Sequence, residues 1–113
     1  MIIINSKWLV KICSFNFASA MAIFPFILLN NKTLKQNKVL INHEKIHLRQ
    51  QLELLIVFFY IWYFTEYFIH FIRFKNRRKA YMNISFEKEA YYFEKDLNYI
   101  EKRNFFSFLK FLN

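Results

Sequence analysis

The stretch NHEKIHLRQQ, residues 42–51, decides both the fold class and the chemistry of this 113-residue chain. It opens a run that continues to about residue 74 without glycine or proline, and Asn42 is suited to cap a helix, so a long helix is predicted over residues 42–74. Residues four apart on a helix share a face, so His43 and His47 would point the same way. Two imidazoles one turn apart can bind a single metal ion.

His43, Glu44 and His47 form an HExxH sequence, in which each residue type has its own task. The histidines supply nitrogen ligands, whereas Glu44, about a quarter-turn away, is placed to hold a metal-bound water rather than the metal. The cation acidifies this water, which becomes the nucleophile with Glu44 as its general base. The competing interpretation is two surface histidines on a solvated helical turn.

A catalytic zinc site needs a third protein ligand, which leaves a fourth position for water. Cys13 lies in an apolar stretch that favours a buried, inert thiol, and His70 lies on the far part of the same predicted helix. We therefore expect an acidic ligand from a later helix. A helix predicted near residues 85–103 supplies Glu87 and Glu89.

HExxH followed by Glu-x-x-Ala on another helix resembles the gluzincin metallopeptidases, particularly the membrane CaaX-protease type and the short minigluzincins. The resemblance implies a zinc ion bound by His43, His47 and Glu87, with Ala90 allowing close helix packing. The segment 42–51 and the aromatic stretch after it also resemble small membrane-associated proteins of Bacteroidetes type.

The chain departs from the gluzincin pattern at Tyr91, where the family has an aspartate that orients a histidine ligand. The orienting residue is left open between Tyr91, Glu94 one turn on, and a group elsewhere. The third ligand also stays open. The resemblance favours Glu87, whereas an apolar stripe centred on Phe86 would bury Glu89 more deeply.

The composition predicts contact with a membrane. The chain is 56% hydrophobic and 22% aromatic, which is more apolar surface than a small globule can hide. Residues 12–29 carry no charged side chain and are either embedded in a membrane or part of the core. A net charge of +9 beside apolar surface suits anionic lipid better than nucleic acid, because the basic residues are scattered. We expect a bacterial inner-membrane protein on the cytoplasmic side rather than a secreted one.

The expected fold is a single, minimal zincin-like domain over residues 1–113, and its class is mainly α. Pro25 interrupts the first apolar segment and favours extended chain over residues 24–29. The β-branched run at 39–41 would pair with it as a short hairpin or edge strand before the HExxH helix. The three principal helices are expected near residues 7–22, 42–74 and 85–103.

The sequence thus predicts a membrane-associated zinc peptidase that acts on a peptide or protein substrate. Its zinc ligands would be His43, His47 and Glu87, and its catalytic base Glu44. The alternative is a non-catalytic membrane or interaction protein with a metal-stabilised fold, because so short a chain leaves little room for a substrate cleft. Membrane lipid is an expected partner and nucleic acid is not, while the substrate and the oligomeric state stay open.

Overall fold

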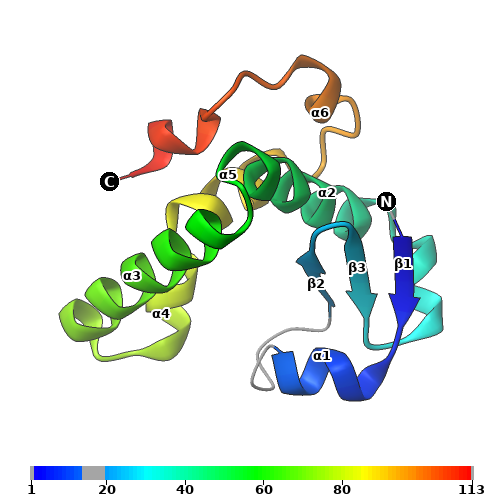
Figure 1. Cartoon of the computed structure of the whole chain (residues 1–113), viewed down its shortest axis with the longest axis horizontal. Coiled ribbons are helices and arrows are strands. Elements are labelled where there is room, and N and C mark those ends of the chain that lie inside the picture. Colours follow the sequence, from blue (N-terminus) through cyan, green and yellow to red (C-terminus); the bar gives the residue numbers. More distant parts are fainter. Residues whose placement is uncertain (1, 14–19, 113) are drawn as a thin grey trace.

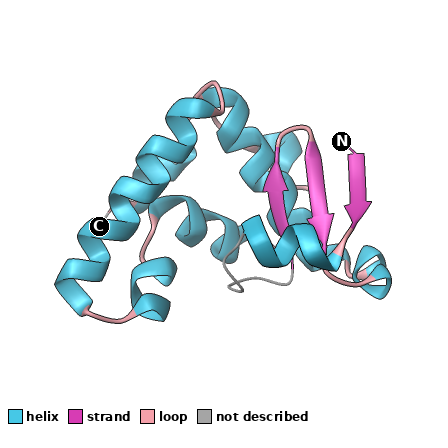
Figure 2. Ribbon diagram, turned by 60° about the horizontal axis from the view of Figure 1, so that its bottom comes forward, coloured by secondary structure: helices cyan, strands magenta, loops and turns pink. Residues whose placement is uncertain are grey.

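The computed structural model describes residues 2–13 and 20–112, which form a mainly helical structure with a small three-stranded sheet at one end (Figures 1 and 2). The prediction of a mainly α fold with strands before the HExxH helix is confirmed. The strands are β1 (Ile2–Asn5), β2 (Ala20–Ile23) and β3 (Phe26–Leu29). The helices are α1 (Lys7–Cys13), α2 (Lys38–Glu53), α3 (Val57–Phe74), α4 (Arg77–Met82), α5 (Ser85–Phe93) and α6 (Tyr99–Lys102), with 3-10 turns η1 (Lys32–Gln36) and η2 (Ser107–Phe111).

The sheet is built around β3, which pairs in parallel with β1 and antiparallel with β2. The small side chains of Ala20 and Ala22 on β2 are buried, and they let α2 pack close against the sheet. Ile41 and Leu48 of α2 complete this part of the core. The described part of the apolar segment 12–29 therefore contributes to the core of the fold.

The short hairpin lies earlier in the chain than predicted. It joins β2 to β3, so the extended chain expected over residues 24–29 is present over 26–29, whereas 24 and 25 form the turn and residues 39–41 belong to the first turn of α2. The helix predicted near residues 7–22 is wrong over 20–22, because these residues form ladder hydrogen bonds with β3 instead. Residues 14–19 of that predicted helix lie outside the described residues.

The helix that carries the HExxH sequence begins four residues before the predicted start. Asn37, and not Asn42, is its N-cap, and the Asn37 side chain accepts a hydrogen bond from the backbone N–H of Leu40 at 3.1 Å. The β-branched run is helical because this cap starts the helix ahead of it and the sheet buries Ile41. Asn42 therefore lies inside the helix.

The long helix predicted over residues 42–74 is broken into α2 and α3. Leu55 and Ile56 have φ angles of 58° and 63°, and the two helices meet at 113°. Positive φ is unfavourable for a branched side chain, so tertiary packing must stabilise this turn. The packing differs on its two sides, because α2 contacts the sheet and α5 whereas α3 contacts α4.

The helix predicted near residues 85–103 is also interrupted, and it forms α5 and α6 with an irregular link between them. Ser85, the first residue of α5, donates from both its backbone N–H and its hydroxyl to the Glu66 carboxylate on α3. Among the described helices, none alone has the length and hydrophobicity of a membrane span. The bent pair α2 and α3 meets those criteria when taken together.

Gln51 joins α2 to the sheet, so its removal should destabilise the fold. Its side-chain oxygen accepts from the Phe24 N–H at 2.7 Å, and its nitrogen donates to the Ala22 carbonyl at 2.8 Å. We expect Gln51→Leu to lower the free energy of unfolding by about 1–3 kcal/mol, because the buried Phe24 N–H loses its acceptor. Denaturant titration followed by circular dichroism measures this. The exposed Gln36, changed to Leu, is the control, and equal stability of the two variants would contradict the prediction.

Candidate metal centre

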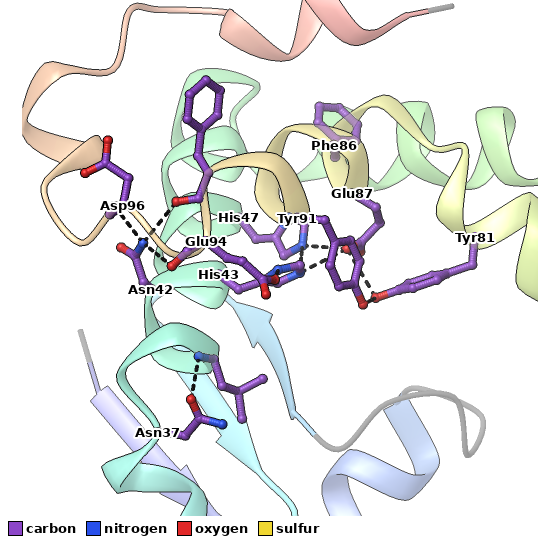
Figure 3. Close-up of polar contacts among 12 residues, drawn as sticks. Asn37, Asn42, His43, His47, Tyr81, Phe86, Glu87, Tyr91, Glu94 and Asp96 are labelled. Atoms are coloured by element: carbon purple, nitrogen blue, oxygen red, sulfur yellow. Dashed lines mark hydrogen bonds and ion pairs between the residues drawn. The ribbon is translucent and has the colours of Figure 1, made fainter.

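The candidate site lies where α2 packs against α5. Helix α2 presents His43 and His47, and α5 presents Glu87 (Figure 3). Glu44 also belongs to α2. The two helices meet through Ile46 and Ala90, which are both fully buried. Side chains separated by 40 to 44 positions in sequence are thereby brought to one place.

Three side-chain atoms converge in this site. The Nε2 atoms of His43 and His47 lie 3.1 and 3.0 Å from Oε1 of Glu87, and 3.2 Å from each other. All three residues are buried, and together they could hold a metal ion. A tetrahedral zinc ion with bonds of about 2.0–2.1 Å has ligand atoms about 3.3–3.4 Å apart, so the three atoms already have nearly the required spacing.

The outer nitrogen of each imidazole faces an acceptor. Nδ1 of His43 lies 2.8 Å from the Glu94 carboxylate, and Nδ1 of His47 lies 2.8 Å from the Gln50 side-chain oxygen. The direction of the Gln50 amide is fixed, because its nitrogen donates to the Phe86 carbonyl at 3.1 Å and to a carboxylate oxygen at 3.0 Å. Each neutral histidine therefore carries its proton on Nδ1 and directs the lone pair of Nε2 inward.

The tautomers of the two histidines determine whether the cluster contains a proton donor of its own. Two Nε2 lone pairs and one carboxylate oxygen are all acceptors, and neutral imidazoles in these tautomers offer no proton between them. Only a cation or an added proton satisfies them. Without metal, burial by itself would lower the pKa of His47, but the Glu87 carboxylate raises it to about 9. In the absence of metal the site thus holds a proton in its place.

Glu87 is held as a carboxylate by its surroundings. Burial alone would raise its pKa, but the charges and hydrogen bonds of His47 and His43 lower it well below the usual range. Tyr63 donates to its Oε2 at 2.7 Å, and Tyr81 donates to its Oε1 at 3.2 Å. Burial raises the pKa of Tyr63, which keeps this phenol protonated as a donor. The role of Tyr63 was not predicted, because it lies on α3 within a run of aromatic residues.

Glu89 does not join the histidines. It accepts hydrogen bonds from Arg103 Nε at 2.6 Å, Arg103 Nη2 at 3.0 Å and the Tyr99 hydroxyl at 2.6 Å. Arg103 also donates to Glu53 at 2.6 Å. Glu89 is indeed the more deeply buried of the two acids, as the apolar stripe predicts, but its charge is paired with arginine, and its Oε1 also accepts from the Gln50 side chain at 3.0 Å.

Glu44 lies beside the cluster, in the wall of an open pocket. Burial raises its pKa, and it makes no hydrogen bond with another described residue. Its carboxylate is thus next to the histidines without being tied to any of them. The pocket has a volume of about 290 Å³ and is lined by Ala20, Asn37, Val39, Leu40, His43, Glu44, Arg78, Tyr81, Tyr91 and Glu94.

Of the candidates for orienting a histidine, Glu94 contacts the outer nitrogen of His43. Tyr91 packs its ring edge-on against the His43 imidazole, with ring centroids 4.4 Å apart, and its hydroxyl lies 3.0 Å from that of Tyr81. Asn42 fixes the end of α5 near Glu94, because its amide donates to the carbonyls of Glu94 and Asp96 at 2.8 and 3.0 Å (Figure 3).

No protein-family model, curated protein or solved structure matches this chain. The gluzincin resemblance therefore stays a prediction. What the site can do follows from its own donor set, which is two neutral nitrogens, one carboxylate oxygen, and a further carboxylate beside an open pocket.

Removing the Glu94 carboxylate should weaken zinc binding. We expect Glu94→Ala to lower the affinity about 10- to 100-fold, because Nδ1 of His43 loses its acceptor and the ring its orientation. Competition against a chelating dye measures this. Glu101→Ala removes an exposed carboxylate and serves as the control. Equal affinities of the two variants would contradict the role assigned to Glu94.

Zinc binding should also depend on pH. Below about pH 9 the ion must displace the proton from His47, so the apparent association constant should rise about tenfold per pH unit and level off above that value. Glu87 stays ionised over this range and adds no further dependence. Calorimetry in buffers of different protonation enthalpy should show release of about one proton near neutral pH. Binding without proton release would contradict the assigned pairing.

Proposed function

We propose that the chain is a zinc-dependent peptidase in which His43, His47 and Glu87 hold the metal and Glu44 is the general base. One observation carries the proposal. Two imidazole lone pairs and a carboxylate oxygen converge, neither lone pair has a donor among the described residues, and a second carboxylate, that of Glu44, lies in the adjoining pocket.

A zinc ion bound by these three residues would lower the pKa of a water in its fourth position and polarise a substrate carbonyl. Glu44 can take the proton of that water, because its carboxylate is buried beside the histidines and makes no competing hydrogen bond with a described residue. The raised pKa of Glu44 makes it a better base than an exposed glutamate. It also allows the proton to pass on to the leaving amine.

Two tyrosine side chains of the pocket are suited to donate hydrogen bonds to the substrate carbonyl. The hydroxyls of Tyr81 and Tyr91 line it, and burial raises the pKa of both, so each stays protonated. A protonated phenol can donate to the oxygen on which negative charge develops as the carbonyl is attacked. These tyrosines would support the reaction without binding the metal.

The edge of the sheet offers a place for an extended peptide. The Ala22 carbonyl points away from β3 toward Gln51. Ala20, two residues earlier on the same strand, therefore points its backbone groups the same way. Ala20 also lines the pocket, so a peptide paired with this edge would run past Glu44. This arrangement supports a peptide substrate over a small molecule.

The alternative is a metal-stabilised protein without catalysis, and one observation favours it. The cluster joins α2 to α5, so an ion there would hold the two halves of the chain together whether or not Glu44 acts as a base. Both proposals expect zinc in the protein. They differ in whether the zinc-loaded wild type cleaves peptides, and in whether losing the Glu44 carboxylate abolishes that cleavage.

Glu44→Gln should abolish hydrolysis and leave zinc binding intact. We expect peptide cleavage to fall about 10²–10⁴-fold, because the amide cannot accept a proton. Zinc content is measured by elemental analysis, and cleavage of a peptide library by mass spectrometry. Lys45→Gln, the next position on the same helix, is the matched control and should keep wild-type turnover. Equal cleavage by wild type and the Glu44 variant would rule out the base. Zinc-loaded wild type that cleaves nothing would favour the alternative.

A further inference from the structure

Helix α3 has its polar and apolar faces reversed relative to a helix in water. Its large exposed hydrophobic side chains are Val57, Phe58, Ile61, Phe64, Phe68, Ile69, Phe71 and Ile72, with exposed fractions from 39% for Phe71 to 73% for Ile72. At about 100° per residue they share an arc of roughly 160°. We call this arc the outer face of α3. In a helix that faces water, this is where charged residues would lie.

Three polar residues of α3, Glu66, Tyr63 and Tyr60, lie on the other side of the helix and have hydrogen-bond partners inside the protein. Glu66 accepts from Ser85, Tyr63 donates to Glu87, and Tyr60 donates to the Ala22 carbonyl. Thr65 is the polar residue within the outer arc, and its hydroxyl donates to the Ile61 carbonyl of the same helix at 2.7 Å. The outer face therefore presents no polar side chain in need of water.

The segment after the outer face is strongly basic. Residues 73–79, here called the basic segment, hold the exposed cations Arg73, Lys75, Arg77, Arg78 and Lys79. The chain has no aspartate or glutamate between Glu66 and Glu87. A wide apolar face next to a concentrated positive charge matches the surface of a bilayer with anionic headgroups.

We propose that the outer face of α3 docks in the plane of an anionic membrane, with the basic segment on the lipid headgroups. The helix does not span the bilayer. Its 18 residues are about 27 Å long, which is shorter than the hydrocarbon core of about 30 Å, and its inner face carries Glu66 and His70. An in-plane position buries the apolar arc and leaves these polar groups inside the protein.

The side chains at the borders of the arc fit this position. Trp62 lies along one border and Tyr67 along the other, and both are half-buried. Indole and phenol rings concentrate at the level where lipid chains meet headgroups. The turn before α3 also exposes Leu55, at 71%.

A second copy of the chain suits the outer face less well than lipid. Each copy carries a net charge of +9, so two copies repel each other, whereas an anionic bilayer attracts each one. The outer face also offers no charged side chain that could set the register of a protein partner. The inference does not depend on the proposed peptidase activity, and Glu44→Gln protein can be used to test it.

The test is flotation of the purified full chain with vesicles of phosphatidylcholine, with and without phosphatidylglycerol. The wild type should float with the anionic vesicles. Ile61→Glu combined with Phe68→Glu should lower the partition coefficient at least about 100-fold, because two apolar side chains no longer enter the bilayer. Lys75→Gln combined with Lys79→Gln should lower it about 30-fold, at about fivefold per cation. Leu97→Glu alters an exposed apolar residue outside α3 and should bind like wild type.

A second measurement does not depend on the folding of the acidic variants. In Trp8→Phe protein, Trp62 is the remaining tryptophan, and brominated acyl chains should quench its fluorescence. Three outcomes would overturn the proposal. In the first, the wild type does not bind vesicles. In the second, the Ile61/Phe68 variant binds as well as the wild type. In the third, the wild type is a dimer without lipid and the two substitutions make it a monomer. Absence of Trp62 quenching by bound protein would exclude the in-plane position.

Discussion

Three hydrogen-bond acceptors meet inside this protein, and only one of them, Oε1 of Glu87, has a donor among the described residues, the Tyr81 hydroxyl at 3.2 Å. The Nε2 lone pairs of His43 and His47 and the Oε1 of Glu87 approach within 3.0–3.2 Å. This arrangement would repel unless a positive charge were present, and burial removes the water that could screen it. The requirement for a cation thus follows from the positions of the atoms and the tautomers that their neighbours impose.

The surrounding polar residues hold the two histidines in these tautomers and positions. Gln50 faces His47 because Phe86 and Glu89 take its two amide hydrogens, and Glu89 in turn is paired with Arg103. Glu94 is held near His43 by Asn42 at the end of α5. A buried polar network of this kind is costly when any member lacks a partner, so it fixes one geometry rather than several.

The buried polar groups and the exposed apolar side chains of α3 both follow from which side of this helix packs against the protein. Helix α2 buries its amides, its histidines and Glu44, and α3 directs Glu66 and Tyr63 toward α5 and Tyr60 toward the sheet. The interior thus takes up polar groups that would otherwise face water. The outer face of α3 is left to aromatic and aliphatic side chains, and the basic segment follows directly.

The sequence by itself determined the helical class, the HExxH face and the acidic residues available as a third ligand. These features depend on spacing within a few turns, which a helix converts directly into geometry. Only the tertiary structure decided that Glu87 rather than Glu89 meets the histidines. The Glu89 carboxylate instead forms an ion pair with Arg103, fourteen residues further along the chain. The tertiary structure also decided the break at Leu55 and Ile56, where no glycine or proline marks a turn and the different partners of α2 and α3 impose the bend. Contacts between distant segments produce no repeating pattern of residue types along the sequence, and for that reason they could not be predicted from it.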